Sequence, residues 1–148
     1  MRGNYCKGRS ILVLHTVLPL LAGGLLYWFF SPEVLFVQAI DSLLGIRHFS
    51  YSFNADNLFF TLIRNYFLDG LWAYSLYCIL KLIIDNSKIQ LTVAILGAVT
   101  MELVQLIPSV PGTYDIWDIV IEIIGITLAF AVTKRIYVGV KQNEKETN

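Results

Sequence analysis

An unbroken apolar run from Ile11 to Phe30 is the feature that most limits what this chain can fold into. The run contains no charged side chain. A helix that crosses a bilayer needs about 20 apolar residues, because each residue rises about 1.5 Å and the hydrocarbon core is about 30 Å thick. The run reaches that length, is long for the core of a signal peptide, and is followed by no small-residue cleavage pattern. It therefore predicts a membrane-spanning helix over residues 11–30.

Three more apolar windows follow, and we expect spans at residues 66–84, 89–107 and 118–138. Hydrophobic residues form 56% of the chain and charged residues 15%, against about 25% charged in a soluble domain. The sequence thus predicts an all-α, polytopic membrane helix bundle with four transmembrane helices in one domain, residues 1–148. The net charge of zero lacks the basic excess that nucleic-acid binding requires, so no nucleic-acid partner is expected.

The basic residues predict the orientation of the bundle. Lysine and arginine concentrate on the cytoplasmic side of membrane proteins. With the N-terminus inside, only Arg47 and Arg64 of the 11 basic residues fall outside. Both termini, including the tail 139–148, are therefore expected to be cytoplasmic, in a multi-pass protein of a cell membrane, most simply the bacterial cytoplasmic membrane.

The long connection 31–65 is expected to lie at the outer face. Ser31-Pro32-Glu33 is typical of a helix start, and apolar residues then recur at helical spacing until Gly45, where the helix could end. This pattern predicts an amphipathic helix in the outer interface. Two interpretations stay open: the segment covers the bundle, or it forms a lid or a lipid-facing entrance.

Carboxylates inside the expected spans are the informative feature. Asp69, Glu102 and Glu122 each lie roughly 4 to 8 Å below the outer boundary, at 1.5 Å per residue. A charge at the centre of a spanning helix costs about 2.5 to 3.5 kcal/mol, and less near its ends. Because the three acids share one depth, we expect them to form one layer. Such acids would couple, so we expect one or more to stay protonated at neutral pH.

Spacing also assigns these acids to helix faces. Glu102 and Gln105 are three residues apart and share a face of the third span. Asp115, Asp118 and Glu122 form one stripe if the fourth helix starts by Asp115. The connection between these helices is short, so they must be antiparallel neighbours whose acidic faces can meet.

Nearby residues complete this picture. Gly125 continues the acidic stripe and would let another helix approach closely, and Gly23-Gly24 predicts a second close contact. Arg64, just outside the second span, is the nearest expected counter-charge. His15 lies toward the opposite side of the membrane and is interpreted as a hydrogen-bonded packing residue.

A purely structural interpretation competes for some of the acids. Asp115 and Asp118 would sit at a helix N-terminus, where the helix dipole favours an anion. Glu102 is near a helix C-terminus, and Glu122 is a full turn below Asp118, so a polar-core or functional role is favoured for these two. Common catalytic and metal-binding motifs are absent. No cofactor is expected, and the sequence assigns neither a metal ligand nor a catalytic residue.

The stretch Glu102-Leu-Val-Gln105, followed by Asp115-Ile-Trp-Asp118-Ile-Val-Ile-Glu122-Ile-Ile-Gly125, resembles the VanZ-like family of small membrane proteins. That family has a Glu-x-x-Gln pair that ends one helix, then an acidic pair followed by Asn and Gly. Here Glu122 replaces the Asn, and Gly112-Thr113 stand where the family has an arginine. The resemblance implies an association with resistance to glycopeptides such as teicoplanin.

The leading hypothesis is a non-enzymatic protein whose outward-facing acidic pocket binds a membrane lipid or another lipid-linked or amphipathic cationic ligand of the cell envelope. One alternative is an intramembrane enzyme that acts on a lipid headgroup, with Glu102 or Asp118 as general base. Another is a small ion-coupled or proton-coupled carrier, which would need a homo-oligomer to form a pore. The candidate ligand-binding residues are Asp69, Glu102, Gln105, Asp115, Asp118, Glu122 and Arg64.

Overall fold

The computed structural model describes residues 2–30, 35–45, 62, 66–107 and 114–146, and the regular structure in these residues is helical. The all-α prediction is confirmed. The helices and their bounds are α1 (Arg2–Phe30), α2 (Leu35–Leu44), α4 (Leu68–Ile83), α5 (Ser87–Val104) and α6 (Ile116–Glu146).

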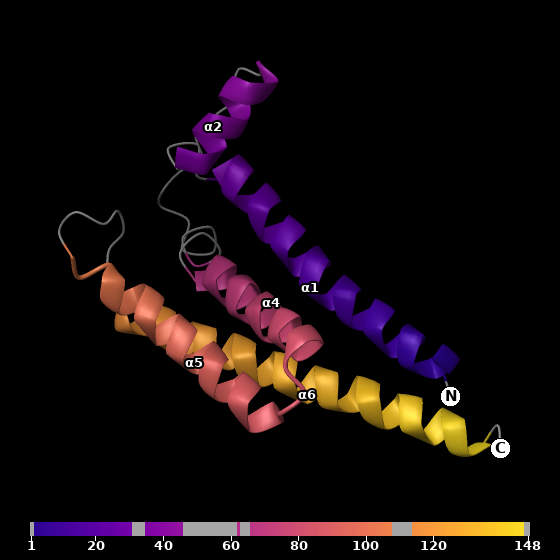
Figure 1. Cartoon of the computed structure of the whole chain (residues 1–148). Coiled ribbons are helices and arrows are strands. Elements are labelled where there is room, and N and C mark those ends of the chain that lie inside the picture. Colours follow the sequence, from indigo (N-terminus) through magenta and orange to yellow (C-terminus); the bar gives the residue numbers. More distant parts are fainter. Residues whose placement is uncertain (1, 31–34, 46–61, 63–65, 108–113, 147–148) are drawn as a thin grey trace.

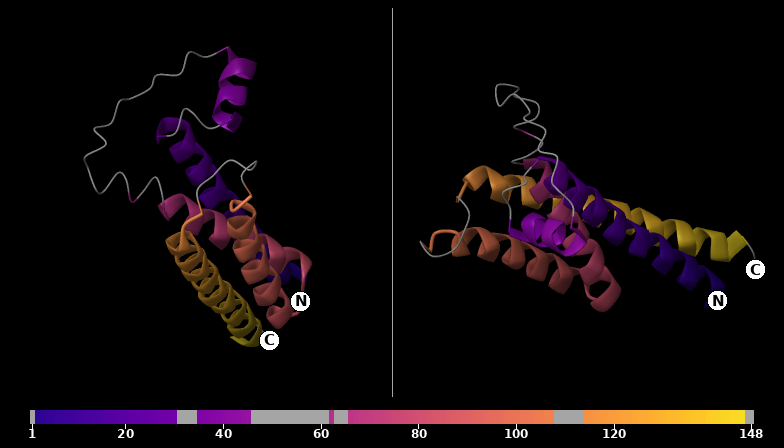
Figure 2. Two further views of the ribbon diagram at one scale, coloured as in Figure 1. Left: turned by 90° about the vertical axis from the view of Figure 1, so that its left-hand side faces the viewer. Right: turned by 90° about the horizontal axis from the view of Figure 1, so that it is seen from above.

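Helix α4 is the centre of the bundle. It packs between α1 and α6, while α5 packs against both α4 and α6 (Figure 1). Helices α5 and α6 are antiparallel neighbours, as the short connection between them predicts. The N- and C-terminal ends of the chain lie at the same end of the bundle (Figures 1 and 2).

Small side chains form much of the core and let the helices approach closely. Ala73 of α4, Ala94 and Ala98 of α5 and Ala129 of α6 are fully buried. Tyr77 is the largest fully buried side chain, and its hydroxyl donates to Gln90 Oε1 at 3.2 Å. Alanine at helix contacts is typical of membrane bundles, where close backbone packing takes over part of the role of the hydrophobic effect.

The closest helix contact joins α4 and α6 at two glycines. An ideal Cβ placed on Gly125 would lie 2.5 Å from the carbonyl oxygen of Gly70, so the close approach predicted at Gly125 is confirmed. The helix contact predicted at Gly23-Gly24 is absent from the described part of the chain, where no atom lies within 4 Å of a Cβ placed at either position. The reason is visible in Figure 1: toward its C-terminal end, α1 diverges from the other helices.

Three helices contain a segment long and apolar enough to cross a membrane: Gly8–Phe29, Ser87–Val104 and Ile116–Gly139. Many of their large apolar side chains are exposed, including Leu18 and Leu128, at 59% and 56%. A soluble monomer rarely carries so much exposed apolar surface, whereas lipid would cover it in a bilayer. These features indicate a membrane protein. Helix α4 has 16 residues, and its membrane crossing stays a prediction.

Helix α2 confirms part of the prediction for the long connection. It ends at Gly45, whose φ of +64° is the left-handed conformation that glycine adopts readily. It is tied to α1 by a hydrogen bond of 2.8 Å from Trp28 Nε1 to Asp41 Oδ1. Residues 31–34, 46–61 and 63–65 are outside the described residues, and so is the predicted counter-charge Arg64.

The interpretation of His15 as a packing residue is supported. Its Nδ1 shares a hydrogen bond of 2.7 Å with the Tyr74 hydroxyl of α4. This hydrogen bond joins α1 to α4.

Candidate functional site

Three helices bring four carboxylates together at one end of the bundle. They are Asp69 of α4, Glu102 of α5, and Asp118 and Glu122 of α6, and we call this group the acidic cluster. Glu122 lies within electrostatic reach of the other three, and Asp118 lies within reach of Asp69 and Glu102. The acids that we expected to lie together are therefore close enough to interact, while their common depth in a membrane stays a prediction.

Burial separates the two glutamates from ordinary surface acids. Glu102 and Glu122 are 4% and 3% exposed. Glu102 Oε1 accepts a hydrogen bond of 3.1 Å from Gln105 Nε2, so the predicted face shared by these two residues is observed. The second carboxylate oxygen of each glutamate is buried and has no hydrogen-bond partner in the part of the chain that the structure describes. A buried polar atom left without a partner costs about 1 to 3 kcal/mol, and more if charged.

Asp115 has a different role from the buried glutamates. It immediately precedes α6, and its Oδ1 accepts a hydrogen bond of 3.0 Å from the Trp117 backbone N–H. Its Oδ2 accepts a hydrogen bond of 3.3 Å from the Tyr66 hydroxyl. These bonds are those of an acid that caps a helix N-terminus, which supports the structural interpretation of this residue.

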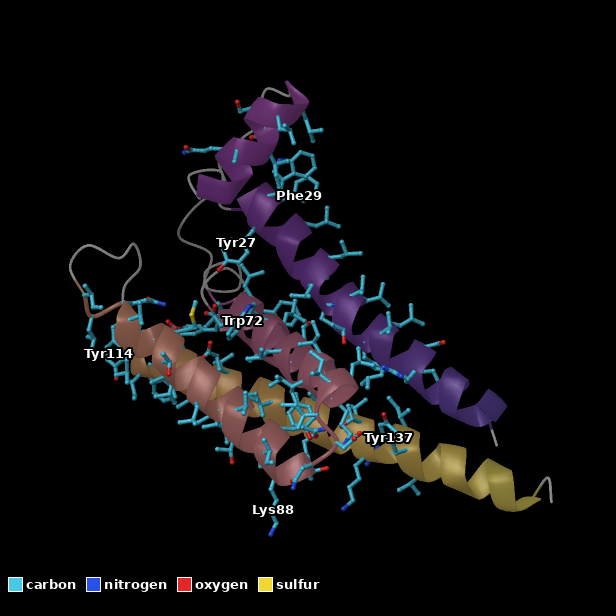
Figure 3. The ribbon with its side chains drawn as sticks, in the orientation of Figure 1. Tyr27, Phe29, Trp72, Lys88, Tyr114 and Tyr137 are labelled. Atoms are coloured by element: carbon cyan, nitrogen blue, oxygen red, sulfur yellow. The ribbon has the colours of Figure 1, made fainter. Side chains whose placement is uncertain are left out.

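Two tyrosines join the site without any signal in the sequence pattern. Tyr66 contacts Asp115, and the Tyr27 hydroxyl lies within electrostatic reach of Asp69 and Asp118. Figure 3 shows Tyr27 above Trp72, between the C-terminal part of α1 and the start of α4. A tyrosine at the end of an apolar span is common, so its proximity to the acids follows only from how α1 crosses α4.

The described basic side chains lie far from the acidic cluster. They are found at the N-terminal ends of α1 and α5 and toward the C-terminal ends of α4 and α6, which together form the opposite end of the bundle. These residues are Arg9, Lys81, Lys88, Lys134 and Arg135. Within the described part of the chain, no group of three or more His, Cys, Asp or Glu could hold a metal ion.

An apolar groove of about 510 Å³ runs along α4 and α6 beside the acidic cluster, and we call it the lateral groove. Residues that line the groove are sequence neighbours of the acidic cluster: Gly70 follows Asp69 on α4, and Ile121 precedes Glu122 on α6. Tyr66 belongs to the groove and also bonds to Asp115 at its end. The lining residues are Leu62, Tyr66, Phe67, Gly70, Leu71, Tyr74, Ile121, Ile124, Gly125 and Leu128.

Comparisons with protein-family models, curated proteins and solved structures found no match for this chain. The fold and the site define an all-α membrane protein with a buried acidic cluster at one end of its bundle.

Proposed function

We propose that the acidic cluster is a binding pocket for the cationic group of an amphipathic or lipid-linked ligand at the outer face of a cell membrane. The observation that carries this proposal is the pair of buried glutamates. Among the described residues, Glu102 and Glu122 each keep one carboxylate oxygen without a hydrogen-bond partner, and both lie within electrostatic reach of Asp118. A bound cation would balance the negative charge that these acids carry when ionised.

The proposal includes a topology of four spans with both termini in the cytoplasm, in which α4 crosses the membrane as the second span. Helix α4 packs between α1 and α6, two of the apolar helices that are long enough to cross. Its 16 residues rise about 24 Å, and the adjoining residues Tyr66 and Phe67 extend it with a wider turn. The excess of basic residues at the opposite end of the bundle favours a cytoplasmic location for that end.

The lateral groove supports a ligand that has an apolar chain. A cavity of this size falls within the roughly 300 to 1,000 Å³ of known ligand pockets. Because the groove opens along α4 and α6, a lipid chain can enter it from the bilayer. Tyr66 lines the groove and donates a hydrogen bond to Asp115, which precedes the helix that carries Asp118 and Glu122. This contact connects the apolar groove with the acidic cluster. One amphipathic molecule can therefore place its chain in the groove and its cation among the carboxylates.

Resistance to glycopeptides such as teicoplanin is the cellular role that we propose with this binding. It rests on the resemblance of the segment from Glu102 to Gly125 to the VanZ-like family. The departures from that family concern the same site: an arginine is missing, and Glu122 adds an acid. Both changes make the pocket more acidic, which favours a cationic group over an anion.

Binding can be tested with dodecyltrimethylammonium, which carries one permanent charge and one alkyl chain. The protein would be purified in dodecyl maltoside, an uncharged detergent with the same chain length. We expect the added cation to raise the melting temperature, because a compound that binds the folded state stabilises it. In the variant that combines Glu102→Gln and Glu122→Gln, the apparent affinity should fall at least tenfold.

Asp85→Asn is the matched control for charge, since Asp85 is exposed and lies between α4 and α5, away from the cluster. This variant should bind the cation as the wild type does. Equal stabilisation of the wild type and the double glutamate variant would show that the acidic cluster is not the binding site.

A further inference from the structure

A second pocket lies at the opposite, basic end of the bundle, where α4 ends and α5 begins. It has a volume of about 270 Å³ and is formed by α4, α5 and α6. Two lysines and a serine supply polar groups at its rim, while Tyr77, Phe130 and Tyr137 supply aromatic walls. We call it the basic pocket. The Tyr77 hydroxyl already donates to Gln90, and the hydroxyl of Thr133, which also lines the pocket, donates to the Phe130 carbonyl oxygen, so the lysines and the serine of the rim are the groups left to receive a ligand.

Lys81 is held in this pocket by two contacts. Its Nζ donates a hydrogen bond of 3.3 Å to Ser87 Oγ and lies 5.3 Å from the centre of the Tyr137 ring. A lysine at the end of a spanning helix usually extends its ammonium group toward water. Here the ammonium group lies between Ser87 of α5 and Tyr137 of α6, in an exposed hydrogen bond and without a carboxylate among these two contacts.

The other groups around the pocket add to its positive potential. Lys134 of α6 is a lining residue with an exposed side chain. Ser87 is the first residue of α5, whose N-terminus carries the positive end of the helix dipole. Asp85, in the connection between α4 and α5, is exposed and does not line the pocket.

We propose that the basic pocket binds a phosphate group through Lys81, Lys134 and Ser87. Ammonium groups and a hydroxyl are groups with which proteins hold phosphate. The dipole of α5 adds positive potential, although the Asn86 side chain already accepts from the backbone N–H groups of Lys88 and Ile89. The pocket lies at the last turn of α4 and close to Gly139, where the apolar segment of α6 ends. Basic pockets between spanning helices at this level accept the headgroups of anionic lipids. The inference does not depend on the function of the acidic cluster.

Three probes distinguish the sources of such a phosphate. The protein in dodecyl maltoside, which contains no phosphate, would be titrated with phosphatidylglycerol, with inorganic phosphate and with oleate, and its melting temperature followed. Stabilisation by phosphatidylglycerol identifies a lipid headgroup, and stabilisation by inorganic phosphate identifies a soluble one. Stabilisation by oleate to the same extent, or by none of the three, would overturn the proposal.

Substitutions locate the site. The combination of Lys81→Met and Lys134→Met should weaken binding of the stabilising phosphate compound roughly thirtyfold, at about fivefold for each lysine. Lys134→Met by itself should weaken binding of the same compound about fivefold. Because Lys134 is exposed, this variant is expected to fold. Lys81→Arg combined with Lys134→Arg should retain binding.

Lys88→Gln is the matched control. It removes the same charge from the same end of the bundle, but Lys88 is exposed and extends away from the pocket, whereas Tyr137 lies beside the end of α4 (Figure 3). The affinity of the Lys88→Gln variant for the stabilising phosphate compound should stay within about twofold of the wild-type affinity. A loss in Lys88→Gln as large as that of the double lysine variant would contradict the proposal.

Discussion

Gly125→Ala is expected to destabilise the bundle strongly, although it adds a single methyl group. That methyl would lie 2.5 Å from the carbonyl oxygen of Gly70 and 3.2 Å from its carbonyl carbon. Backbone atoms cannot rotate away as a side chain can, so α4 and α6 must separate. Added volume in a packed core costs 1 to 3 kcal/mol, and we expect about 3 kcal/mol here. Thermal unfolding in detergent should show a melting temperature lower by roughly 6 to 12 °C.

Two other glycines provide a graded comparison. A methyl on Gly70 would meet the side-chain Cγ2 of Ile121 at 3.2 Å, which can shift, so Gly70→Ala should cost less. Gly24→Ala adds its methyl to open space on α1 and should leave the stability unchanged or slightly raised, because alanine favours a helix. Equal losses at Gly125 and Gly24 would show that the close contact between α4 and α6 is not a determinant of the fold.

Glu122→Gln is expected to make the protein more stable and less able to bind a cation. The amide keeps the size of the side chain but cannot carry a charge at this buried position, which lies within electrostatic reach of Glu102, Asp69 and Asp118. It also supplies a donor to a layer in which Glu102 keeps one carboxylate oxygen without a hydrogen-bond partner among the described residues. Giving a buried polar atom its missing hydrogen-bond partner raises the free energy of unfolding by about 1 to 3 kcal/mol. The melting temperature should therefore rise by several degrees, while stabilisation by dodecyltrimethylammonium declines.

These opposite changes are typical of a functional site, where a protein keeps groups that lower its stability. Asp85→Asn, which removes an exposed acid, should change neither the melting temperature nor its rise with dodecyltrimethylammonium. If Glu122→Gln instead lowered the melting temperature, the glutamate would be a structural part of the core, and the binding role would lose its main support.

The sequence predicted the parts of the fold that depend on length and local spacing. The apolar run that ends at Phe30 forms α1, and the glycine at position 45 ends α2. The spacing of Glu102 and Gln105 placed both on one face, and their hydrogen bond follows from it. Such features arise within one helix, where the 3.6-residue repeat determines which side chains are neighbours.

Features that depend on the path of one helix past another could not be predicted in the same way. The pair Gly23-Gly24 has the composition of a close contact, but α1 diverges before it can make one. Tyr27 reaches the acidic cluster from the same region of α1, although its sequence neighbours give no sign of this. The basic pocket likewise combines Lys81, Ser87 and Lys134 from three helices.

Accessibility of a cysteine at position 118 tests the central claim most directly. Cys6 and Cys78 would first be replaced by serine, and Asp118→Cys introduced at a partly exposed position of the acidic cluster. In intact bacterial cells, a thiol reagent that cannot cross the membrane should label this cysteine, and dodecyltrimethylammonium should slow the labelling severalfold. Glu144→Cys, in the tail, should react only after permeabilisation. Labelling of position 118 only in permeabilised cells, or at a rate that the alkylammonium compound does not change, would contradict an outward-facing acidic pocket that binds cations.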